Sequence, residues 1–203
     1  MSTWAILLAA GSGTRFGSRK QDLNVDGKPL WRWSYETLFA CDLDGVIVVG
    51  ADLPGAIAGG SRRQDSVAAG LKAIPDDCSL VIVHDAARPM ISRELVARVI
   101  DRCRVGDVDG VVPGLPVTDT IKVIEGDMVD HTPDRAALVV AQTPQAFRAD
   151  VLRSAHAEIV GDVTDDASML ELAGFSIAVV PGDERNIKIT FPHDLRLLAL
   201  ETP

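Results

Sequence analysis

A glycine turn with basic residues follows the first apolar segment of the sequence, residues 4–8. Gly11 and Gly13 carry no side chain, so backbone N–H groups there can approach phosphate oxygens closely. Arg15 adds a guanidinium that can bind a phosphate through two N–H groups, and Lys20 adds a second positive charge. The turn predicts a site for a phosphorylated ligand, although a plain tight turn would also explain the glycines.

The spacing of the glycines separates this turn from two common nucleotide-binding motifs. A dinucleotide-binding turn reads G-x-G-x-x-G, but Phe16 occupies the third glycine position. A P-loop reads G-x-x-x-x-G-K-[ST], and no segment of the sequence has that pattern. What remains is a glycine turn followed by cations, which suits a nucleoside triphosphate.

A carboxylate follows another apolar run, residues 80–83. Asp85 would lie at the carboxyl end of a buried strand, where α/β proteins bind their ligands. An oxygen ligand in that place suits Mg²⁺, and the same side chain could instead cap a turn. We expect His84, which leaves the same strand, to satisfy a backbone group rather than to take part in chemistry.

The composition restricts the possible partners. A net charge of −9 opposes binding to nucleic acids, whose phosphate backbones require a basic surface. No apolar run reaches the roughly 20 residues that span a bilayer, and the N-terminus lacks the pattern of a secretory signal. Cys41, Cys78 and Cys103 have no C-x-x-C spacing, which favours buried free thiols in a reducing compartment. We therefore expect a cytoplasmic protein that binds neither nucleic acid nor membranes.

Short apolar runs alternate with stretches of helical periodicity, which predicts an α/β protein with a mostly parallel sheet between helices. We expect one domain over residues 1–203, a length that can bury a core. The predicted strands are residues 4–8, 46–49, 80–83, 110–112, 177–180 and 187–189. The predicted helices are residues 29–40, 67–74, 94–103 after an N-cap at Ser92, one after an N-cap at Thr164, and 192–200.

Residues 118–141 break this alternation. Two stretches, 120–124 and 127–131, flank Glu125-Gly126 and predict a short β-hairpin. A hairpin alone is marginally stable in water, so it should pack against something else. That surface could be the edge of its own sheet or a second subunit.

Recognisable segments recur in one order from about residue 5 to residue 198: LLAAGSGTRFG, Lys20-Gln21, HDAARP, PVTDTIK, HTPDR, QTPQAF, VTDDASMLE and NIKIT. Together they resemble the 2-C-methyl-D-erythritol 4-phosphate cytidylyltransferase family of the non-mevalonate isoprenoid pathway. The resemblance implies a Rossmann-like (glycosyltransferase-A-like) nucleotidyltransferase fold with a protruding β-hairpin arm. It implies a Mg²⁺-dependent enzyme that transfers CMP from CTP to methylerythritol phosphate and releases pyrophosphate. The arm, about residues 115–142, would reach over the second subunit of a homodimer.

The resemblance also assigns roles to residues. The catalytic cations would be Arg15, Lys20 and Lys188, and the metal ligand would be Asp85. The turn after the first strand and the segment 60–66, which resembles the family's base-recognition segment, would bind CTP through Ala9, Ala10, Gly11, Gly13, Arg15, Lys20, Arg63, Ser66 and Asp85. The acceptor would be bound by Asp85, Arg88, Thr120, Arg135, Thr143, Thr164 and Lys188. Of these, Arg135 and Thr143 would come from the neighbouring subunit.

Three other functions compete with this one. A ribitol 5-phosphate cytidylyltransferase would share the nucleotide site and use a different acceptor. A nicotinamide-dependent oxidoreductase is disfavoured by the missing third glycine. A catalytically weak nucleotide-binding homologue is suggested by the short loop before Lys20 and the short segment 50–58, but the retained basic residues oppose it.

Overall fold

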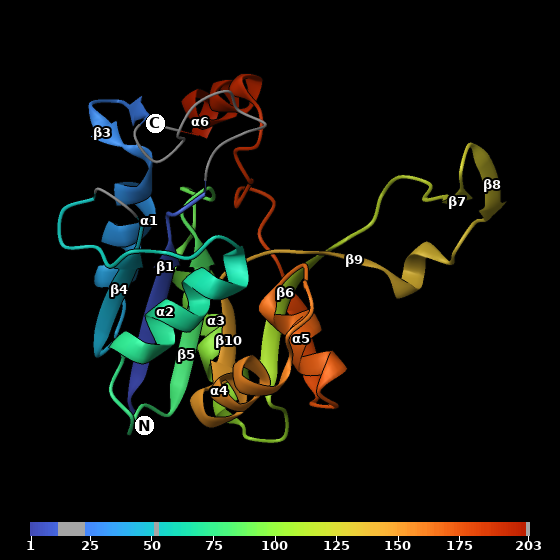
Figure 1. The fold of residues 1–203 in the computed structure, drawn as a ribbon. Helices are drawn as coiled ribbons and strands as arrows, with labels where there is room; N and C mark the ends of the chain where they lie inside the picture. The colour runs from blue at the N-terminus through green and yellow to red at the C-terminus, as the bar shows by residue number, and fades with distance from the viewer. Residues whose placement is uncertain (12–22, 51–52, 202–203) are drawn as a thin grey trace.

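A seven-stranded sheet forms the centre of the protein, for which the computed structural model describes residues 1–11, 23–50 and 53–201 (Figure 1). The strand order is β11-β6-β10-β5-β1-β4, and β9 pairs with the far part of β6. β1 is parallel to β4 and β5, β11 is parallel to β6, and β10 runs antiparallel between β5 and β6. The strands are β1 (Thr3–Leu8), β4 (Gly45–Val49), β5 (Leu80–Asp85), β6 (Gly110–Pro116), β9 (Val139–Ala141), β10 (Gln145–Arg148) and β11 (Ile177–Pro181). The predicted mostly parallel sheet is confirmed.

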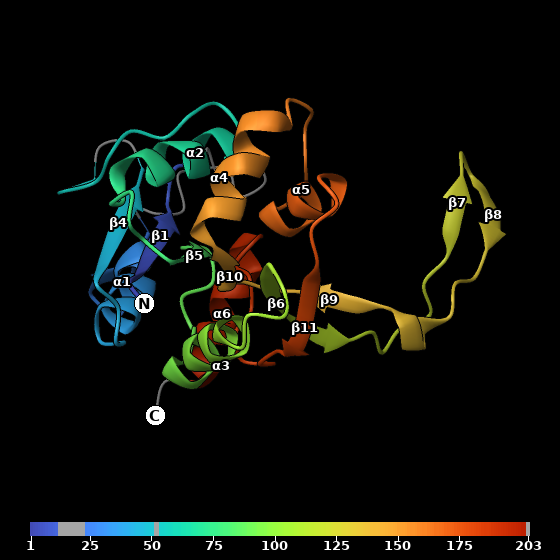
Figure 2. The same cartoon turned by 90° about the horizontal axis from the view of Figure 1, so that it is seen from below.

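Helices cover both faces of the sheet (Figure 2). Successive side chains of a strand point to opposite faces, so Ala5 and Leu7 enter one core and Ile6 enters the other. α1 (Leu30–Phe39) and α3 (Arg93–Arg104) cover the first core. α2 (Arg63–Ala73), α4 (Ala149–Glu158) and α5 (Asp166–Leu172) cover the second. A 3-10 turn, Pro192–Asp194, leads into α6 (Leu195–Glu201), which helps to enclose a smaller cluster around Leu30 and Ile189.

One predicted strand does not form, and other strands were not predicted. The predicted strand 187–189 does not form, although the Ile189 N–H donates to the Ala87 carbonyl at 2.8 Å. β10 was not predicted, because only two residues in the run Gln145–Arg148 are apolar. A small hairpin of β2 (Asn24–Val25) and β3 (Lys28–Pro29) was also missed. Its signal was the dipeptide Asp26-Gly27, whose φ angles of 51° and 79° are those of a tight hairpin turn.

Helix starts depend on short polar side chains, and two predicted starts are wrong. Ser92 caps α3 as predicted, accepting from the Leu95 N–H at 3.2 Å. The cap of α5 is Asp165 rather than Thr164, because the Asp165 carboxylate accepts from the Ser168 N–H at 2.9 Å. α2 starts at Arg63, four residues before the predicted start. Its first turn is polar and gives no apolar periodicity.

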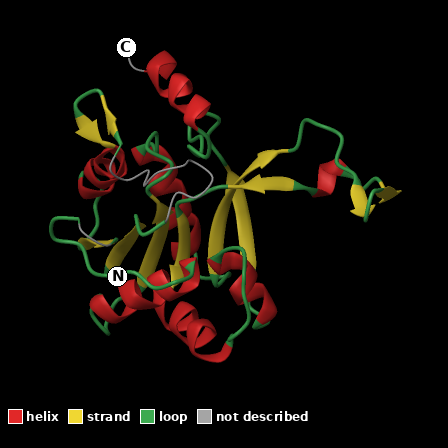
Figure 3. Cartoon of the chain, turned by 45° about the horizontal axis from the view of Figure 1, so that its top comes forward, coloured by secondary structure: helices red, strands yellow, loops and turns green. Residues whose placement is uncertain are grey.

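The predicted hairpin projects from one edge of the sheet instead of lying on it (Figure 3). It consists of β7 (Val123–Glu125) and β8 (Met128–His131), paired so that Gly126-Asp127 forms the turn. The predicted turn, Glu125-Gly126, is therefore displaced by one residue; Gly126 has a φ of 60°, which favours glycine. We call residues 117–138 the arm. Its base is β6 paired with β9, and a 3-10 turn, Arg135–Ala137, precedes β9.

The arm and its base expose many apolar side chains. Exposed apolar patches are common at interaction surfaces. The exposed side chains are Ile121, Val123, Ile124, Met128, Val129, Val139 and Val140.

All three cysteines are free thiols, as expected. Cys78 and Cys103 are buried, whereas Cys41 is only half-buried, so the expectation of three buried thiols is wrong for Cys41. It follows the last turn of α1, where the helix meets the surface, and its Sγ donates to the Thr37 carbonyl at 3.2 Å.

Candidate active site

Charged side chains meet at the carboxyl end of β5. Asp85 is the last residue of that strand, and its side chain is 14% exposed. Its Oδ2 accepts a hydrogen bond from Lys188 Nζ at 2.7 Å, and its Oδ1 accepts one from Arg63 Nε at 3.3 Å. Arg63 begins α2, and Lys188 lies between β11 and α6. Three residues predicted for the site from distant parts of the chain are thus in direct contact.

Arg63 connects this carboxylate to a second one. Its Nη1 donates to Asp166 Oδ2 at 2.6 Å, and Asp166 Oδ1 lies 3.2 Å from Nε2 of His156. The remaining nitrogen of Arg63, Nη2, is buried and has no hydrogen-bond partner in the described part of the chain. A buried guanidinium N–H without a partner is a donor suited to a phosphate oxygen.

Ionisation follows from these contacts. Burial alone would raise the pKa of the Asp85 carboxyl, but the charges of Arg63 and Lys188 hold that pKa well below its usual range. Burial alone would lower the pKa of Arg63, but the charges of Asp166 and Asp85 raise it above the usual value. Asp85 is therefore an anion and Arg63 a cation throughout the physiological pH range.

A chain of hydrogen bonds through Thr143 and His84 holds the backbone of Asp85. His84 Nε2 lies 3.1 Å from the Arg88 carbonyl, which can only accept, so the neutral ring carries its proton on Nε2. Nδ1 then accepts from the Thr143 hydroxyl at 3.0 Å, and that hydroxyl accepts from the Asp85 N–H at 3.1 Å. The structural role expected of His84 is confirmed. Thr143 is buried and its hydroxyl is bonded within its own chain, beside Asp85; its expected service to a neighbouring subunit stays a prediction.

The buried His84 makes the stability of the fold depend on pH. Burial lowers the pKa of His84 from 6.5 to about 4, so between these values the unfolded chain binds more protons than the folded one. The free energy of unfolding is therefore highest, as far as His84 is concerned, above pH 6.5, and it declines as the pH falls from 6.5 toward 4. We expect the free energy of unfolding, measured with urea, to fall by about 2 kcal/mol from pH 7 to pH 5 through this group. His84→Gln should lose that part of the pH dependence; an unchanged slope in the variant would contradict the assignment.

Arg88 is buried among backbone carbonyls. Its Nη1 donates to the Asn186 carbonyl at 2.8 Å and its Nη2 to the Ala141 carbonyl at 3.4 Å, while Nε has no partner among the described residues. Burial lowers the pKa of Arg88, and the nearby charge of Asp85 opposes that shift. Arg88 thus fixes the segment that carries Lys188 against the end of β9; its predicted contact with the acceptor stays a prediction.

The predicted base-recognition segment folds against the turn after β1. Ser66 Oγ accepts from the Gly60 N–H at 3.1 Å and lies 3.3 Å from the Arg62 carbonyl, to which it donates. A Cβ added to Gly59 would lie 2.6 Å from Ala10 Cβ and 2.8 Å from Ser66 Oγ, so this approach needs glycine. Two residues predicted to bind CTP, Ala10 and Ser66, are therefore brought together around Gly59.

The other predicted CTP ligands differ in what the structure describes. Ala9 is buried, and its N–H donates to the Val49 carbonyl at 2.7 Å. Gly11 is exposed, and no atom of the described residues lies within 4 Å of where its Cβ would be. Gly13, Arg15 and Lys20 lie outside the described residues.

Two predicted acceptor ligands lie on the arm, and a third is exposed two residues before Asp166. Thr120 and Arg135 are exposed on the arm, which extends away from the body (Figure 1). Arg135 Nη1 donates to the Thr118 carbonyl at 2.8 Å, a contact within the arm itself. Thr164 is exposed just before α5, and its Oγ1 lies 3.3 Å from Ser168 Oγ.

The site fits a metal ion only in part. Residues 1–11, 23–50 and 53–201 contain no group of three or more His, Cys, Asp or Glu side chains placed to hold a metal. Asp85 offers one carboxylate, and each of its oxygens keeps a lone pair beside its bond to Lys188 or Arg63. Mg²⁺ is commonly held by one or two carboxylates together with substrate phosphates. The residues present therefore suit an ion that arrives with a triphosphate.

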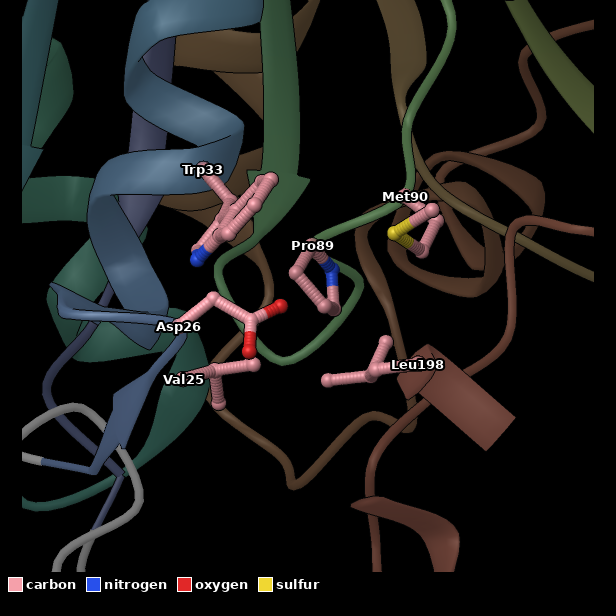
Figure 4. Close-up of a pocket in the computed structure, with 6 residues that line it drawn as sticks. All are labelled: Val25, Asp26, Trp33, Pro89, Met90 and Leu198. Atoms are coloured by element: carbon pink, nitrogen blue, oxygen red, sulfur yellow. The ribbon is translucent and has the colours of Figure 1, made fainter. Parts of the chain in front are cut away.

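A small, mostly apolar cavity of about 20 Å³ lies between the β2–β3 hairpin, α1, the segment after β5 and α6 (Figure 4). The indole N–H of Trp33 is buried there without a partner among the described residues. None of the residues predicted for the site lines the cavity. Its lining is Val25, Asp26, Trp33, Pro89, Met90 and Leu198.

Several residues that support the site were not predicted from the sequence. Asp166 and His156 are two of them. Gln64 is buried and binds the segment before α5, donating to the Gly161 carbonyl at 3.0 Å and accepting from the Val163 N–H at 3.2 Å. A buried position for these residues could not be read from a polar stretch of sequence.

Comparison with known proteins decides the family. The family model for 2-C-methyl-D-erythritol 4-phosphate cytidylyltransferase (IspD) matches residues 3–200. The chain belongs to this family. The bifunctional enzyme IspD/IspF of Solidesulfovibrio magneticus is 46% identical over 98% of the chain, and 57% of that protein is covered. The chain spans less than three fifths of the length of several such bifunctional relatives.

Other members of the IspD family match over most of their own length. The 2-C-methyl-D-erythritol 4-phosphate cytidylyltransferase of Aquifex aeolicus is 40% identical, with 96% of this chain and 94% of that protein covered. The crystal structure of the Thermus thermophilus enzyme of the same name is 37% identical, with a TM-score of 0.81 over 96% of this chain and 98% of that one. The expected nucleotidyltransferase fold is therefore confirmed. No helix in the described part of the chain is long and apolar enough to cross a membrane.

Proposed function

We propose that the protein transfers CMP from CTP to 2-C-methyl-D-erythritol 4-phosphate, giving 4-diphosphocytidyl-2-C-methyl-D-erythritol and pyrophosphate. The observation that carries the proposal is the ion pairing of Asp85 with Lys188 and Arg63 at the carboxyl end of β5 in a chain of the IspD family. Strand ends of this kind are where α/β proteins bind nucleotides. The IspD family supplies the identity of both substrates.

The reaction needs positioning and charge neutralisation more than covalent help. A phosphate oxygen of the acceptor bonds to the α-phosphorus of CTP as the bond to the bridging oxygen of the β-phosphate breaks. The attacking phosphate is already an anion at neutral pH, so no general base is required. Charge on the phosphoryl oxygens must instead be met by fixed cations.

The described residues can supply part of that charge. The ion pair to Asp85 holds the ammonium group of Lys188 at the site, and we assign Lys188 to the reacting phosphates. Arg63 offers its unpaired Nη2 to the triphosphate. Arg15 and Lys20, from the glycine turn, complete the proposed set of cations. Asp85 would hold Mg²⁺ through one carboxylate, and the ion would supply further neutralisation of the triphosphate when bound.

We further propose a cytoplasmic homodimer in which each arm completes the other subunit's site. Thr120 and Arg135 lie on the arm, away from the Asp85 network of their own chain (Figure 1). The exposed apolar side chains of the arm and its base suit a surface covered by a second copy. The three free cysteines are typical of a reducing compartment.

Pyrophosphate release tests the proposal. The protein is incubated with CTP and Mg²⁺ and with methylerythritol phosphate, ribitol 5-phosphate or no acceptor, and each reaction is repeated with EDTA. Release with methylerythritol phosphate alone, abolished by EDTA, is the expected result. Release with ribitol 5-phosphate alone would overturn the acceptor, and release in EDTA would overturn the metal. CTP binding without release would favour the weak nucleotide-binding homologue.

A further inference from the structure

A second buried carboxylate contacts Arg63, one of the residues proposed to bind CTP. Asp166, in the first turn of α5, has a side chain that is 1% exposed. One of its oxygens accepts from Arg63 Nη1 at 2.6 Å, and the other lies 3.2 Å from Nε2 of His156 on α4. A carboxylate oxygen only accepts, so His156 donates this bond. Both oxygens of Asp166 therefore have protein partners.

The position of Arg63 is determined mainly by Asp166. The contact of Arg63 with Asp166 is 2.6 Å, whereas its contact with Asp85 is 3.3 Å, at the long end of hydrogen bonding. The side chain of Arg63 is 27% exposed, so it is neither enclosed by packing nor free in solvent. A guanidinium in such a place keeps one orientation only if a partner holds it.

The charge of Asp166 is stable. Burial would raise the pKa of this carboxyl, but the charge of Arg63 and the bond from His156 hold that pKa below its usual value. The positive charge of Arg63 is thus shared between two anions, Asp85 and Asp166. Without the Asp166 charge, Arg63 would be drawn toward Asp85 and away from the orientation that leaves Nη2 unpaired.

The contact between Arg63 and Asp166 is one of several hydrogen bonds that connect the start of α2 with the segment before α5. Gln64 binds Gly161 and Val163 through both ends of its amide. Arg62 Nη1 donates to Asp162 Oδ1 at 3.0 Å. Three successive residues at the start of α2 therefore bind the segment 161–166, which fixes Asp166 relative to Arg63.

We propose that Asp166 is a positioning residue of the transferase, with His156 holding Asp166, and that it sets the orientation in which Arg63 meets CTP. The inference rests on the proposed function. Asp166 and His156 act through Arg63 and need not touch substrate themselves. Their replacement should weaken CTP binding while leaving the chemical step nearly intact.

Two sets of variants test the inference in the full chain. Asp166→Asn should raise the KM for CTP and the Kd for CTP, measured calorimetrically without acceptor, by about tenfold, with kcat changed less than about threefold. His156→Phe should raise both constants, and His156→Gln, which keeps an N–H donor, should restore them. Asp107→Asn, which removes an exposed carboxylate paired with Arg102, is the matched control and should change neither.

Melting temperature separates positioning from folding. A buried charge that loses its partner destabilises a protein, so Asp166→Asn could fail to fold; the two His156 variants then decide. If the parent protein binds CTP and the affinity is unchanged in folded Asp166→Asn or in His156→Phe, the inference is overturned and the proposed function stands. Failure of the parent protein itself to bind CTP would overturn the proposed function and this inference together.

Discussion

Lys188→Ala should lower kcat for pyrophosphate release by about 100- to 1,000-fold, the loss typical when one charge-stabilising group is removed from a transition state. The ammonium group of Lys188 lies 2.7 Å from Asp85 Oδ2, and the Lys188 side chain is 42% exposed. Its charge opposes the negative charge that develops on the reacting phosphates. Steady-state kinetics with CTP and methylerythritol phosphate measure the effect.

The fold should survive this change. Asp85 keeps Arg63 as a partner, and Lys188 is exposed enough that its loss costs little stability. The melting temperature should therefore stay near that of the parent protein. Lys72→Ala, at an exposed position in the last turn of α2, is the control and should keep full activity. A Lys188→Ala enzyme with kcat within about threefold of the parent would remove Lys188 from the catalytic assignment.

Mixing two inactive variants should restore activity. If the arm of one chain completes the site of the other, a heterodimer of Arg135→Ala and Lys188→Ala contains one site with both residues intact. Random exchange of subunits should then recover roughly a quarter of the parent activity, because half of the dimers are mixed and each has one good site. Each variant alone should be nearly inactive.

The alternative arrangement gives a different result. If each arm served its own chain, every site in the mixture would lack one residue, and activity would not recover. Arg153→Ala serves as the control for Arg135→Ala, because Arg153 binds the carbonyls of Pro75 and Asp76 on the body, outside the proposed site. Mixing Arg153→Ala with Lys188→Ala should only dilute activity. Light scattering on each variant checks that dimers are still formed.

The parallel strands of the central sheet were predictable because buried strands consist of continuous apolar runs. β1 and β5 have that pattern, and their carboxyl ends located Asp85 correctly. β10 was not predictable, because Gln145–Arg148 forms a strand by pairing with β5 and β6 rather than through an apolar pattern of its own. The absence of a strand at 187–189 has the same origin: an apolar run becomes a strand only when a neighbour is available.

The site was predictable where residue type and motif agree. Arg63, Asp85 and Lys188 came from separate segments, and the structure places them in contact. Asp166 and His156 were not predictable, because their importance lies in contacts across the fold that no spacing reveals. The burial of Thr143 was not predictable, since burial depends on the whole sheet and not on the QTPQAF segment alone.

β6 is part of both the central sheet and the base of the arm. Its start, Gly110 and Val111, pairs with β10, its residues 110–114 pair with β11, and its end, residues 114–116, pairs with β9 at the base of the arm. A register error in the sheet would therefore redirect the arm, since a slip of one residue turns every side chain to the other face. In the proposed dimer, the damage would fall on the partner's site. A cell that carries one defective and one sound copy of the gene would then lose catalysis in sites built on sound chains, which is dominant-negative inheritance.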